Sequence, residues 1–398
     1  MRIIQILFKI SMYFIKIAFY VLSVCIPVKK NGVLFMAFHG RGLLDNPGAL
    51  YNEMKSEGLD KKYSIVWVAN EKKDCSSEDI KTVKYQSVLY FYYLARSRYW
   101  IFNCKLPEYI HKKPNQIYIQ TWHGTPLKRL GRDLIESASR KSRSGRNMKQ
   151  VKDSYTIDAG RYNLMISPNA FCTEVFQSAF GVKKDQLIEV GYPRNDVLCS
   201  PSDHLINSLK EKHHIPHNKK VLLYAPTWRD DSYEIKGYSF QLELHFEKWK
   251  KHLPDYLILF KPHYFIINSI KIESEVKDYV RIMDPKSDIN ELYLISDCLV
   301  TDYSSVFFDY ALLKRPIYFY MYDLEKYQNN LRGFYLDIYK DLPGDIYQNE
   351  DQLIQAVKEG KYDYERLSEF NARFNNFQDQ YCSRKIVKMI FEEKQVER

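Results

Sequence analysis

Short apolar runs alternate with amphipathic segments along most of the chain, and each run ends in a turn residue or a polar motif. Such runs predict buried strands, and the segments between them have the spacing of helices. In the first half, strands are predicted at residues 32–39, 63–69, 99–103, 117–120, 164–167 and 186–191, with helices at 47–57, 90–97 and 169–180. This alternation predicts a parallel sheet in an α/β domain of the Rossmann type.

A second alternation begins after a polar stretch at residues 200–220, which contains Pro201, Pro216 and four histidines. Strands are predicted at 221–224, 256–260, 280–283, 298–301 and 316–320, and helices at 242–251, 289–295, from Ser305 onward, 351–359 and 364–374. Polar, proline-containing stretches between periodic segments are typical of domain boundaries. We therefore predict two Rossmann-like domains with parallel sheets, at residues 31–205 and 206–398, which face a central cleft.

Residues 1–30 have a different pattern, because a strongly apolar run is interrupted by two lysines. At helical spacing the polar residues fall on one narrow face, which comprises Arg2, Gln5, Lys9, Lys16, Tyr20 and Ser23. The uncharged remainder, residues 17–28, is shorter than the roughly 20 residues that cross a bilayer. We predict an amphipathic helix on anionic inner-leaflet lipids rather than a signal anchor, which makes the protein peripheral on the cytoplasmic side of the cell membrane. Whether residues 3–28 lie on the membrane or span it stays open.

Composition narrows the class of protein. The 398 residues are 45% hydrophobic, which excludes a disordered or fibrous chain. The formal net charge of +10 indicates an acidic partner, which could be nucleic acid, anionic lipid or a phosphorylated substrate. The seven cysteines are scattered without metal-ligand spacing, so we predict reduced thiols and no metal site.

A twelve-residue motif, Gln-Thr-Trp-His-Gly-Thr-Pro-Leu-Lys-Arg-Leu-Gly, begins at the end of the predicted strand 117–120. His123 follows the carboxyl end of this strand, where α/β folds usually bind ligands. Gly124 permits a tight turn, and Thr125 with the proline after it predicts the start of a helix. Helix starts bind phosphate, and two basic residues near this one strengthen that interpretation, Lys128 and Arg129.

Two further motifs follow predicted strands of the second domain. One places Lys261 and His263 after strand 256–260. The other begins a helix after strand 298–301 and contributes Asp302, Ser304 and Ser305. Serine hydroxyls and free backbone N–H groups at a helix start can hold an anion. The three motifs, all at strand ends, together predict one cleft between the domains.

Two basic features add to this picture. Arg194 follows the strand 186–191, within the motif Gly-Tyr-Pro-Arg-Asn-Asp, where it could contact a phosphate. Residues 132–152 are rich in lysine, arginine and serine, which predicts a flexible loop. A mobile basic loop beside a phosphate cleft can hold an anionic acceptor or lipid head groups.

Five motifs occur in order between about residues 120 and 344: Trp-His-Gly-Thr-Pro-Leu-Lys-Arg-Leu-Gly, Gly-Tyr-Pro-Arg-Asn-Asp, Tyr-Ala-Pro-Thr-Trp-Arg-Asp, Lys-Pro-His and Thr-Asp-Tyr-Ser-Ser-Val-Phe-Phe-Asp-Tyr-Ala. This set resembles the CDP-glycerol glycerophosphotransferase family, which builds teichoic acids and related polymers. The resemblance implies a GT-B-like architecture and an enzyme that transfers glycerol phosphate, or another alditol phosphate, from CDP-glycerol or CDP-ribitol. The acceptor would be a hydroxyl of a polyprenyl-diphosphate-linked saccharide, and CMP would be released. No cofactor and no nucleic acid are implied.

The resemblance also implies roles for residues. His123 would be the general base that deprotonates the acceptor hydroxyl, for which imidazole has a suitable pKa. His263 would contact the donor diphosphate, and Asp309 the ribose hydroxyls, while Asp302 could instead order its turn. The predicted substrate-binding residues are Gly124, Thr125, Lys128, Arg129, Arg194, Asn195, Arg229, Lys261, Asp302, Ser304, Ser305 and Asp309.

The sequence leaves two alternative hypotheses for the function. One is a GT-B glycosyltransferase that uses a nucleotide sugar, and the other is a non-enzymatic basic protein that binds membrane surfaces or nucleic acid. The first needs a sugar-binding carboxylate near the cleft, and the second assigns no role to the two histidines. One catalytic module plus an anchor favours a primase or a short-chain transferase over a long-chain polymerase, although the choice between primase and polymerase stays open. The alditol, the acceptor and the oligomeric state stay open.

Overall fold

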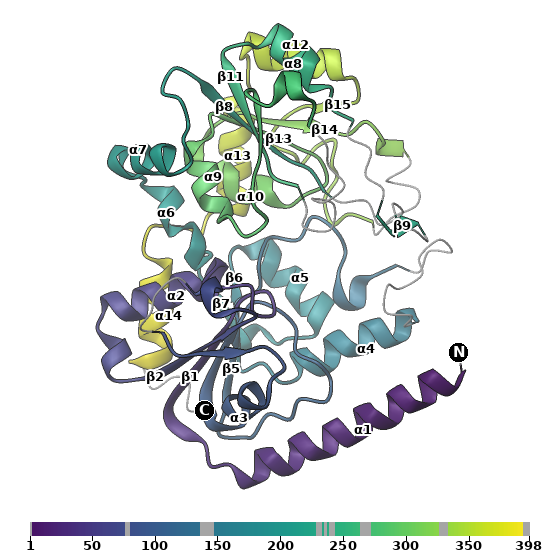
Figure 1. Cartoon of the computed structure of the whole chain (residues 1–398), viewed down its shortest axis with the longest axis vertical. Coiled ribbons are helices and arrows are strands. Elements are labelled where there is room, and N and C mark those ends of the chain that lie inside the picture. Colours follow the sequence, from purple (N-terminus) through teal and green to yellow (C-terminus); the bar gives the residue numbers. More distant parts are fainter. Residues whose placement is uncertain are drawn as a thin grey trace.

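The computed structural model describes residues 2–75, 80–135, 147–227, 233–234, 237–238, 243–262, 272–325 and 333–392, with side chains in the first helix from Tyr13 onward. Two parallel β-sheets lie in two domains, one above the other in Figure 1. The predicted α/β class with two parallel-sheet domains is therefore confirmed.

The first sheet has the strand order β3-β2-β1-β4-β5-β6-β7. Its strands are β1 (Lys29–Met36), β2 (Ser64–Ala69), β3 (Thr82–Lys84), β4 (Ser97–Phe102), β5 (Ile117–Gln120), β6 (Leu164–Ser167) and β7 (Leu187–Glu189). The parallel register pairs Met36 with Phe102, and Phe102 with Gln120. The carboxyl ends of β1, β4 and β5 therefore reach the same edge of the sheet, and the segments that follow them come together there.

Helices cover both faces of this sheet, which explains why its strands are apolar on both sides. They include α2 (Asp45–Ser56), α3 (Val88–Arg96), α4 (Met148–Ala159) and α5 (Ala170–Phe180). Leu34 and Met36 of β1 pack in one core with α3 and α5, whereas Val33 and Phe35 pack in another with α2. Helix α4 lies partly within the basic segment predicted as a loop, and residues 136–146 of that segment lie outside the described residues.

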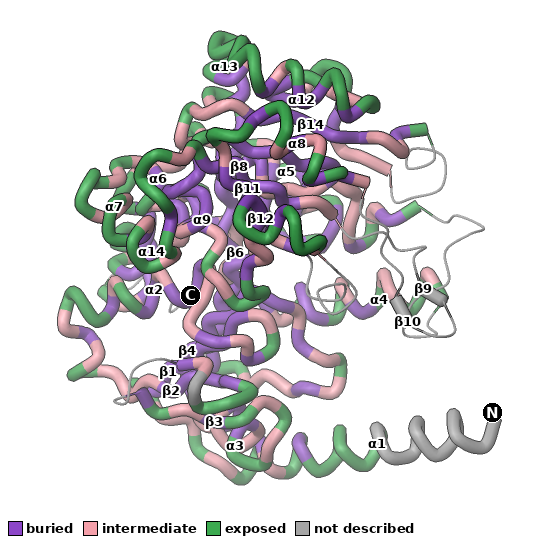
Figure 2. Tube along the Cα trace, turned by 45° about the horizontal axis from the view of Figure 1, so that its top comes forward, coloured by how far each residue is buried: buried purple, intermediate pink, exposed green. Residues whose placement is uncertain are grey.

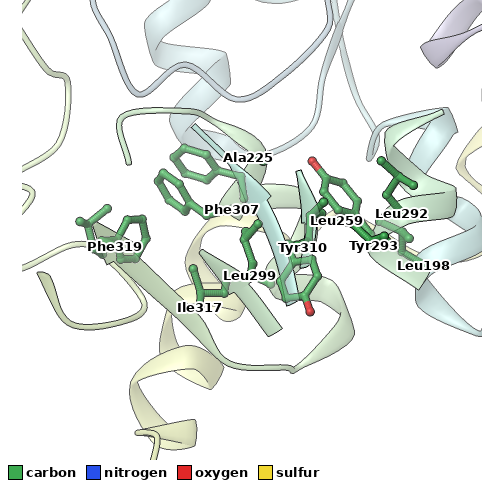
Figure 3. Close-up of a cluster of buried hydrophobic side chains, with 14 of the residues drawn as sticks. Leu198, Ala225, Leu259, Leu292, Tyr293, Leu299, Phe307, Tyr310, Ile317 and Phe319 are labelled. Carbon is green, nitrogen blue, oxygen red and sulfur yellow. The ribbon is translucent and has the colours of Figure 1, made fainter. Parts of the chain in front are cut away.

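The second sheet has the order β12-β11-β8-β13-β14-β15. Its strands are β8 (Lys220–Ala225), β11 (Tyr256–Phe260), β12 (Val280–Ile282), β13 (Cys298–Thr301), β14 (Ile317–Tyr320) and β15 (Ile346–Tyr347), and a separate hairpin pairs β9 (Tyr233–Glu234) with β10 (Gly237–Tyr238). Its helices include α7 (Asp203–Lys212), α8 (Phe246–His252), α9 (Ile289–Ile295), α10 (Val306–Tyr310), α12 (Glu350–Glu359) and α13 (Tyr364–Phe374). In the core drawn in Figure 3, Leu299 of β13 lies among side chains from α10 and β14, such as Phe307 and Ile317.

The domain boundaries differ from the prediction in two places. The predicted boundary at 205/206 falls inside α7, and α7 packs against α9, so the chain enters the second domain before Asp203. The last helix, α14 (Cys382–Phe391), returns to the first domain and lies beside α2 in Figure 1. Its Ile386 and Ile390 are buried in the same core as Phe35 of β1. The first domain is thus completed by the last helix of the chain, because that helix has an apolar face that matches the outer surface of α2.

The carboxyl-terminal half of the amino-terminal helix α1 (Arg2–Cys25) packs on the first domain. The Phe19 ring centroid lies 5.6 Å from that of Phe91 in α3, and Lys113 Nζ donates to the carbonyl oxygen of Ser23 at 2.8 Å. Ser23, on the predicted polar face, is fully buried, so this face is covered by the first domain at its carboxyl-terminal end. Positions from Tyr13 to Ala18 are all exposed, as the green segment of α1 in Figure 2 shows. No helix within the described residues is long and apolar enough to cross a membrane.

Candidate active site between the two domains

His123 lies on a strained turn that leaves the carboxyl end of β5. Trp122 adopts a φ of 51° and Gly124 a φ of 153°, and a bulky residue such as tryptophan adopts positive φ only when its surroundings enforce it. Two amide side chains do so here. Gln120 Oε1 accepts from the Trp122 N–H at 3.0 Å, and Asn46 Nδ2 donates to the Trp122 carbonyl at 3.0 Å. The turn is therefore held from both sides.

The imidazole of His123 has a defined orientation and tautomer. Its Nδ1 lies 2.6 Å from the carbonyl oxygen of Asn103, at the end of β4. A carbonyl can only accept, so Nδ1 carries the proton and Nε2 has a free lone pair. The ring stacks on Trp122 at 4.4 Å and meets the edge of Phe38 at 5.7 Å. Burial lowers the pKa of His123, so the ring is neutral near pH 7 and Nε2 can take up a proton.

The helix predicted to start at Thr125 does not form, and this prediction is wrong. The chain instead runs extended toward the second domain, where Lys128 forms a β-bridge with Phe334. The Arg129 N–H donates to the Gly333 carbonyl at 3.1 Å. These backbone bonds across the domain interface replace the hydrogen bonds that a helix would have made. Thr125 is buried with its hydroxyl 3.4 Å from Asn169 Nδ2, so no helix start presents N–H groups at this motif. Phosphate binding by its residues stays a prediction.

Arg194 joins the two domains through a buried ion-pair cluster. It lies in the short 3-10 helix Pro193–Asn195, and its Nη1 contacts Asp45 Oδ1 at 2.5 Å and the His123 carbonyl at 3.0 Å. Its Nη2 contacts Asp309 Oδ2 at 2.6 Å. Asn195 Nδ2 donates to the other oxygen of Asp309 at 2.7 Å. The predicted ligand residues Arg194, Asn195 and Asp309 thus come together, but they bind one another. Their contacts to a substrate stay predictions.

The serine motif of the second domain lies close to Gly124, the residue after His123. Ser304 and Ser305 are partly exposed between β13 and α10. A Cβ atom on Gly124 would lie only 3.3 Å from Ser305 Oγ, so the two turns are in near contact and a larger residue at Gly124 would separate them. The Asp302 carboxylate accepts from the Thr227 N–H at 2.7 Å, which favours the structural role considered for this residue.

A cavity of about 570 Å³ lies between the domains, next to this cluster. The first domain contributes Phe38 and Asp45 to its lining, and the second contributes Lys261 and Asp288. Lys261 Nζ donates to the carbonyl oxygens of Asp284 at 2.5 Å and Ser287 at 3.0 Å. Burial lowers the pKa of Lys261 to about 8. Its ammonium is therefore charged at neutral pH beside a space that could hold an anionic ligand.

The remaining predicted residues divide into two groups. His263 and Arg229 lie outside the described residues, so their positions are not assigned. Asp45, Asn46 and Asn103 take part in the site but were not predicted. Each follows the carboxyl end of β1 or β4, the same sheet edge as His123, and this shared position was the available signal.

Comparison with known proteins identifies relatives over nearly the whole chain. A sequence model described as CDP-Glycerol:Poly(glycerophosphate) glycerophosphotransferase matches residues 18–392. The chain is 39% identical over 372 residues to the teichoic acid glycerol-phosphate transferase of Staphylococcus aureus (strain NCTC 8325 / PS 47), which covers 91% of this chain and 93% of that protein. It is also 39% identical to a teichoic acid poly(glycerol phosphate) polymerase of Bacillus spizizenii (strain ATCC 23059 / NRRL B-14472 / W23), over 90% of this chain and 89% of the relative.

Among solved structures, a variant of the wall teichoic acid polymerase TagF soaked with CDPG is similar to this chain. The TM-score is 0.85 at 35% sequence identity, and the match covers 93% of this chain and 90% of that one. The arrangement of two parallel-sheet domains is therefore common to both proteins.

Proposed function

Because the chain belongs to the CDP-glycerol:poly(glycerophosphate) glycerophosphotransferase family, we propose that it transfers glycerol phosphate from CDP-glycerol to a hydroxyl of a polyprenyl-diphosphate-linked saccharide, with release of CMP. The chain is a phosphotransferase of the CDP-glycerol type, and the family acts in teichoic acid synthesis. Both relatives named above carry glycerol phosphate in their names, which supports CDP-glycerol over CDP-ribitol as donor. We also assign the two parallel-sheet domains to the GT-B type, which the resemblance to this family implies.

The observation that carries this proposal is the state of His123. Its Nδ1–H donates to the Asn103 carbonyl, and burial lowers its pKa, so a neutral imidazole presents an unprotonated Nε2. An alcohol that attacks phosphorus must lose its proton, and a neutral imidazole fixed in one tautomer is suited to accept it.

The reaction balances with this single base. The acceptor oxygen attacks the β-phosphorus of CDP-glycerol, and its proton passes to His123 Nε2. The bond between the β-phosphorus and the bridging oxygen breaks, and CMP leaves with the electron pair. Negative charge grows on the CMP phosphate as this bond breaks, so cations and N–H donors near the diphosphate stabilise the transition state.

We place that stabilisation in the second domain. Lys261 lies beside the interdomain cavity, and the turn of Ser304 and Ser305 touches the turn of His123. His263 and Arg229 complete the set by motif alone. The Arg194 guanidinium lies between two carboxylates, so we assign it to holding the domains together rather than to binding phosphate directly.

We further propose that α1 holds the enzyme against the inner leaflet, where a lipid-linked acceptor is found. Its exposed apolar side chains in the described part are Tyr13, Phe14, Ile15, Ile17, Tyr20, Val21 and Val24. Apolar side chains this numerous on one projecting helix favour the interfacial region of a membrane over water.

The test is nucleotide release by the purified full chain with a lipid-linked disaccharide acceptor. CMP is measured with CDP-glycerol and with CDP-ribitol, and nucleoside diphosphate is measured with a nucleotide sugar. We expect release from CDP-glycerol, and we expect His123→Ala to reduce it by at least about 100-fold while CDP-glycerol still binds. Donor binding is measured separately by calorimetry. Release from the nucleotide sugar alone would show a glycosyltransferase, and near-native turnover by His123→Ala would exclude this residue as the base.

A further inference from the structure

Asp45 has an unusual backbone conformation, and it belongs to none of the motifs recognised in the sequence. It is the first residue of α2, its φ is 60°, and its side chain is only 3% exposed. Both carboxylate oxygens have partners: Oδ1 contacts Arg194 Nη1 and Oδ2 contacts Asn103 Nδ2, each at 2.5 Å. A buried carboxylate on a left-handed backbone is costly, and such residues concentrate at functional sites.

One of these partners, Asn103, leads to the imidazole of His123. Asn103 uses its side chain to bind Asp45 through Nδ2 and the Phe38 N–H through Oδ1, the latter at 2.8 Å. Its backbone carbonyl is the acceptor of His123 Nδ1 at 2.6 Å. Asp45 therefore fixes the residue that sets the tautomer and the plane of the imidazole.

The second partner leads to the backbone of His123. Arg194 Nη1, which contacts Asp45, also donates to the His123 carbonyl at 3.0 Å. Arg194 is in turn held by Asp309, one turn beyond the Ser304–Ser305 motif. Through these contacts the position of His123 depends on Asp45 at two atoms, one in the ring and one in the main chain.

We propose that Asp45 is a positioning residue for glycerophosphate transfer, which orients His123 through Asn103 and Arg194 without being the base itself. This inference rests on the proposed function, since it takes His123 as the proton acceptor. Small errors in the position of a catalytic group cost on the order of 100-fold in rate, which gives such a residue its importance.

The charges around His123 agree with this role. Burial is the largest influence and lowers the pKa of His123, the Asp45 carboxylate and the Asn103 carbonyl raise it, and Arg194 lowers it. His39 interacts electrostatically with His123. Its pKa is lowered to about 4 by burial and by Arg41, so its imidazole is neutral at neutral pH. Loss of the Asp45 charge therefore shifts the pKa of His123 further down.

The first variant is Asp45→Asn in the full chain. Asparagine tolerates positive φ and has the same shape, but its amide cannot satisfy both Arg194 and Asn103 in their present orientations. We expect kcat for CMP release to fall on the order of 10- to 100-fold while KM for CDP-glycerol changes less than about threefold. The acid limb of the pH–rate profile is expected to move to lower pH, which a purely structural defect would not cause.

The second variant exchanges the two side chains, Asp45→Asn with Asn103→Asp. This swap keeps all three hydrogen bonds, to Arg194, to Phe38 N–H and between the two residues. It moves the negative charge from residue 45 to its hydrogen-bonded partner at 103. We expect it to regain at least about tenfold in kcat over the single variant and to restore the acid limb. If Asp45→Asn does not fold, the swap is compared with the native enzyme and must have a kcat within about threefold of it.

The matched control is Glu53→Gln on the same helix, which loses an ion pair with Arg384 at 3.1 Å and has no link to His123. Its kinetics should equal those of the native enzyme. The positioning role would be overturned if Asp45→Asn had the kcat and the acid limb of the native enzyme, or if the swap were no more active than Asp45→Asn. In that case His123→Ala would still be inactive, and the proposed function would stand. An active His123→Ala would instead refute the proposed function.

Discussion

Replacement of Arg194 by methionine removes the cation between two buried carboxylates that belong to different domains. The side chains of Asp45 and Asp309 are 3% and 6% exposed, and that of Arg194 is 11% exposed. Removal of one partner from a buried ion pair costs about 3–5 kcal/mol, because a buried charge is left without compensation. Each carboxylate here keeps one amide donor, Asn103 or Asn195, so we expect a loss near the lower end, about 3 kcal/mol.

The assay is urea unfolding followed by far-ultraviolet circular dichroism, with Arg384→Met as control. Arg384 is 49% exposed and pairs with Glu53 and Glu57, so its loss should cost at most about 1 kcal/mol. The double variant Arg194→Met with Asp309→Asn should recover about 1–3 kcal/mol relative to the sum of the single changes, because the neutral amide needs no cation. A cost for Arg194→Met no larger than for Arg384→Met, or strict additivity in the double variant, would refute the reasoning.

Three further predictions follow from other parts of the structure. As pH rises through about 8, Lys261 loses its charge, so KM for CDP-glycerol should increase. In Lys261→Arg the KM should stay constant over the same pH range, because guanidinium remains charged. Equal pH profiles for the two enzymes would contradict a role of Lys261 in donor binding. Gly131→Ala should lower the free energy of unfolding, measured by urea unfolding, by at least about 2 kcal/mol. The φ of Gly131 is 59°, and the new Cβ would lie 2.1 Å from the Ala179 carbonyl oxygen. A loss below about 0.5 kcal/mol would contradict this prediction. Phe14→Glu should reduce flotation with anionic vesicles, whereas Tyr364→Glu on α13 should float like the native protein, and equal flotation of both variants would argue against α1 as the anchor.

Much of the fold follows from local patterns. The bounds of β11, α9 and β13 agree with the sequence prediction, because each is a continuous apolar run or an amphipathic turn pattern ended by a polar residue. The positions of His123 after β5 and of Ser304 and Ser305 after β13 also follow from local patterns, since each motif comes directly after a predicted strand. Their roles stay predictions.

The sequence predictions that differ from the structure do so for one reason, which is contacts between segments that are distant in the chain. A threonine followed by a proline favours a helix start at Thr125, yet the backbone of Lys128 pairs with Phe334 of the other domain. Arg194 and Asp309 have the residue types of phosphate and ribose ligands, but they lie 115 positions apart in the sequence and neutralise one another in the fold. Helix α14 follows the second domain in the chain but completes the core of the first.

Hydrophobic period and turn chemistry act over a few residues, so the amino-acid sequence alone establishes most strands and helices, the two-domain α/β class and the position of His123 after a strand end. The short edge strands β3 and β15 were not predicted. The partners of a buried charge depend on which segments meet after folding and on how much water they exclude. That information appears only in the folded chain, where Asp45, Asn103 and Arg194 surround His123 and fix its tautomer, its pKa and its orientation.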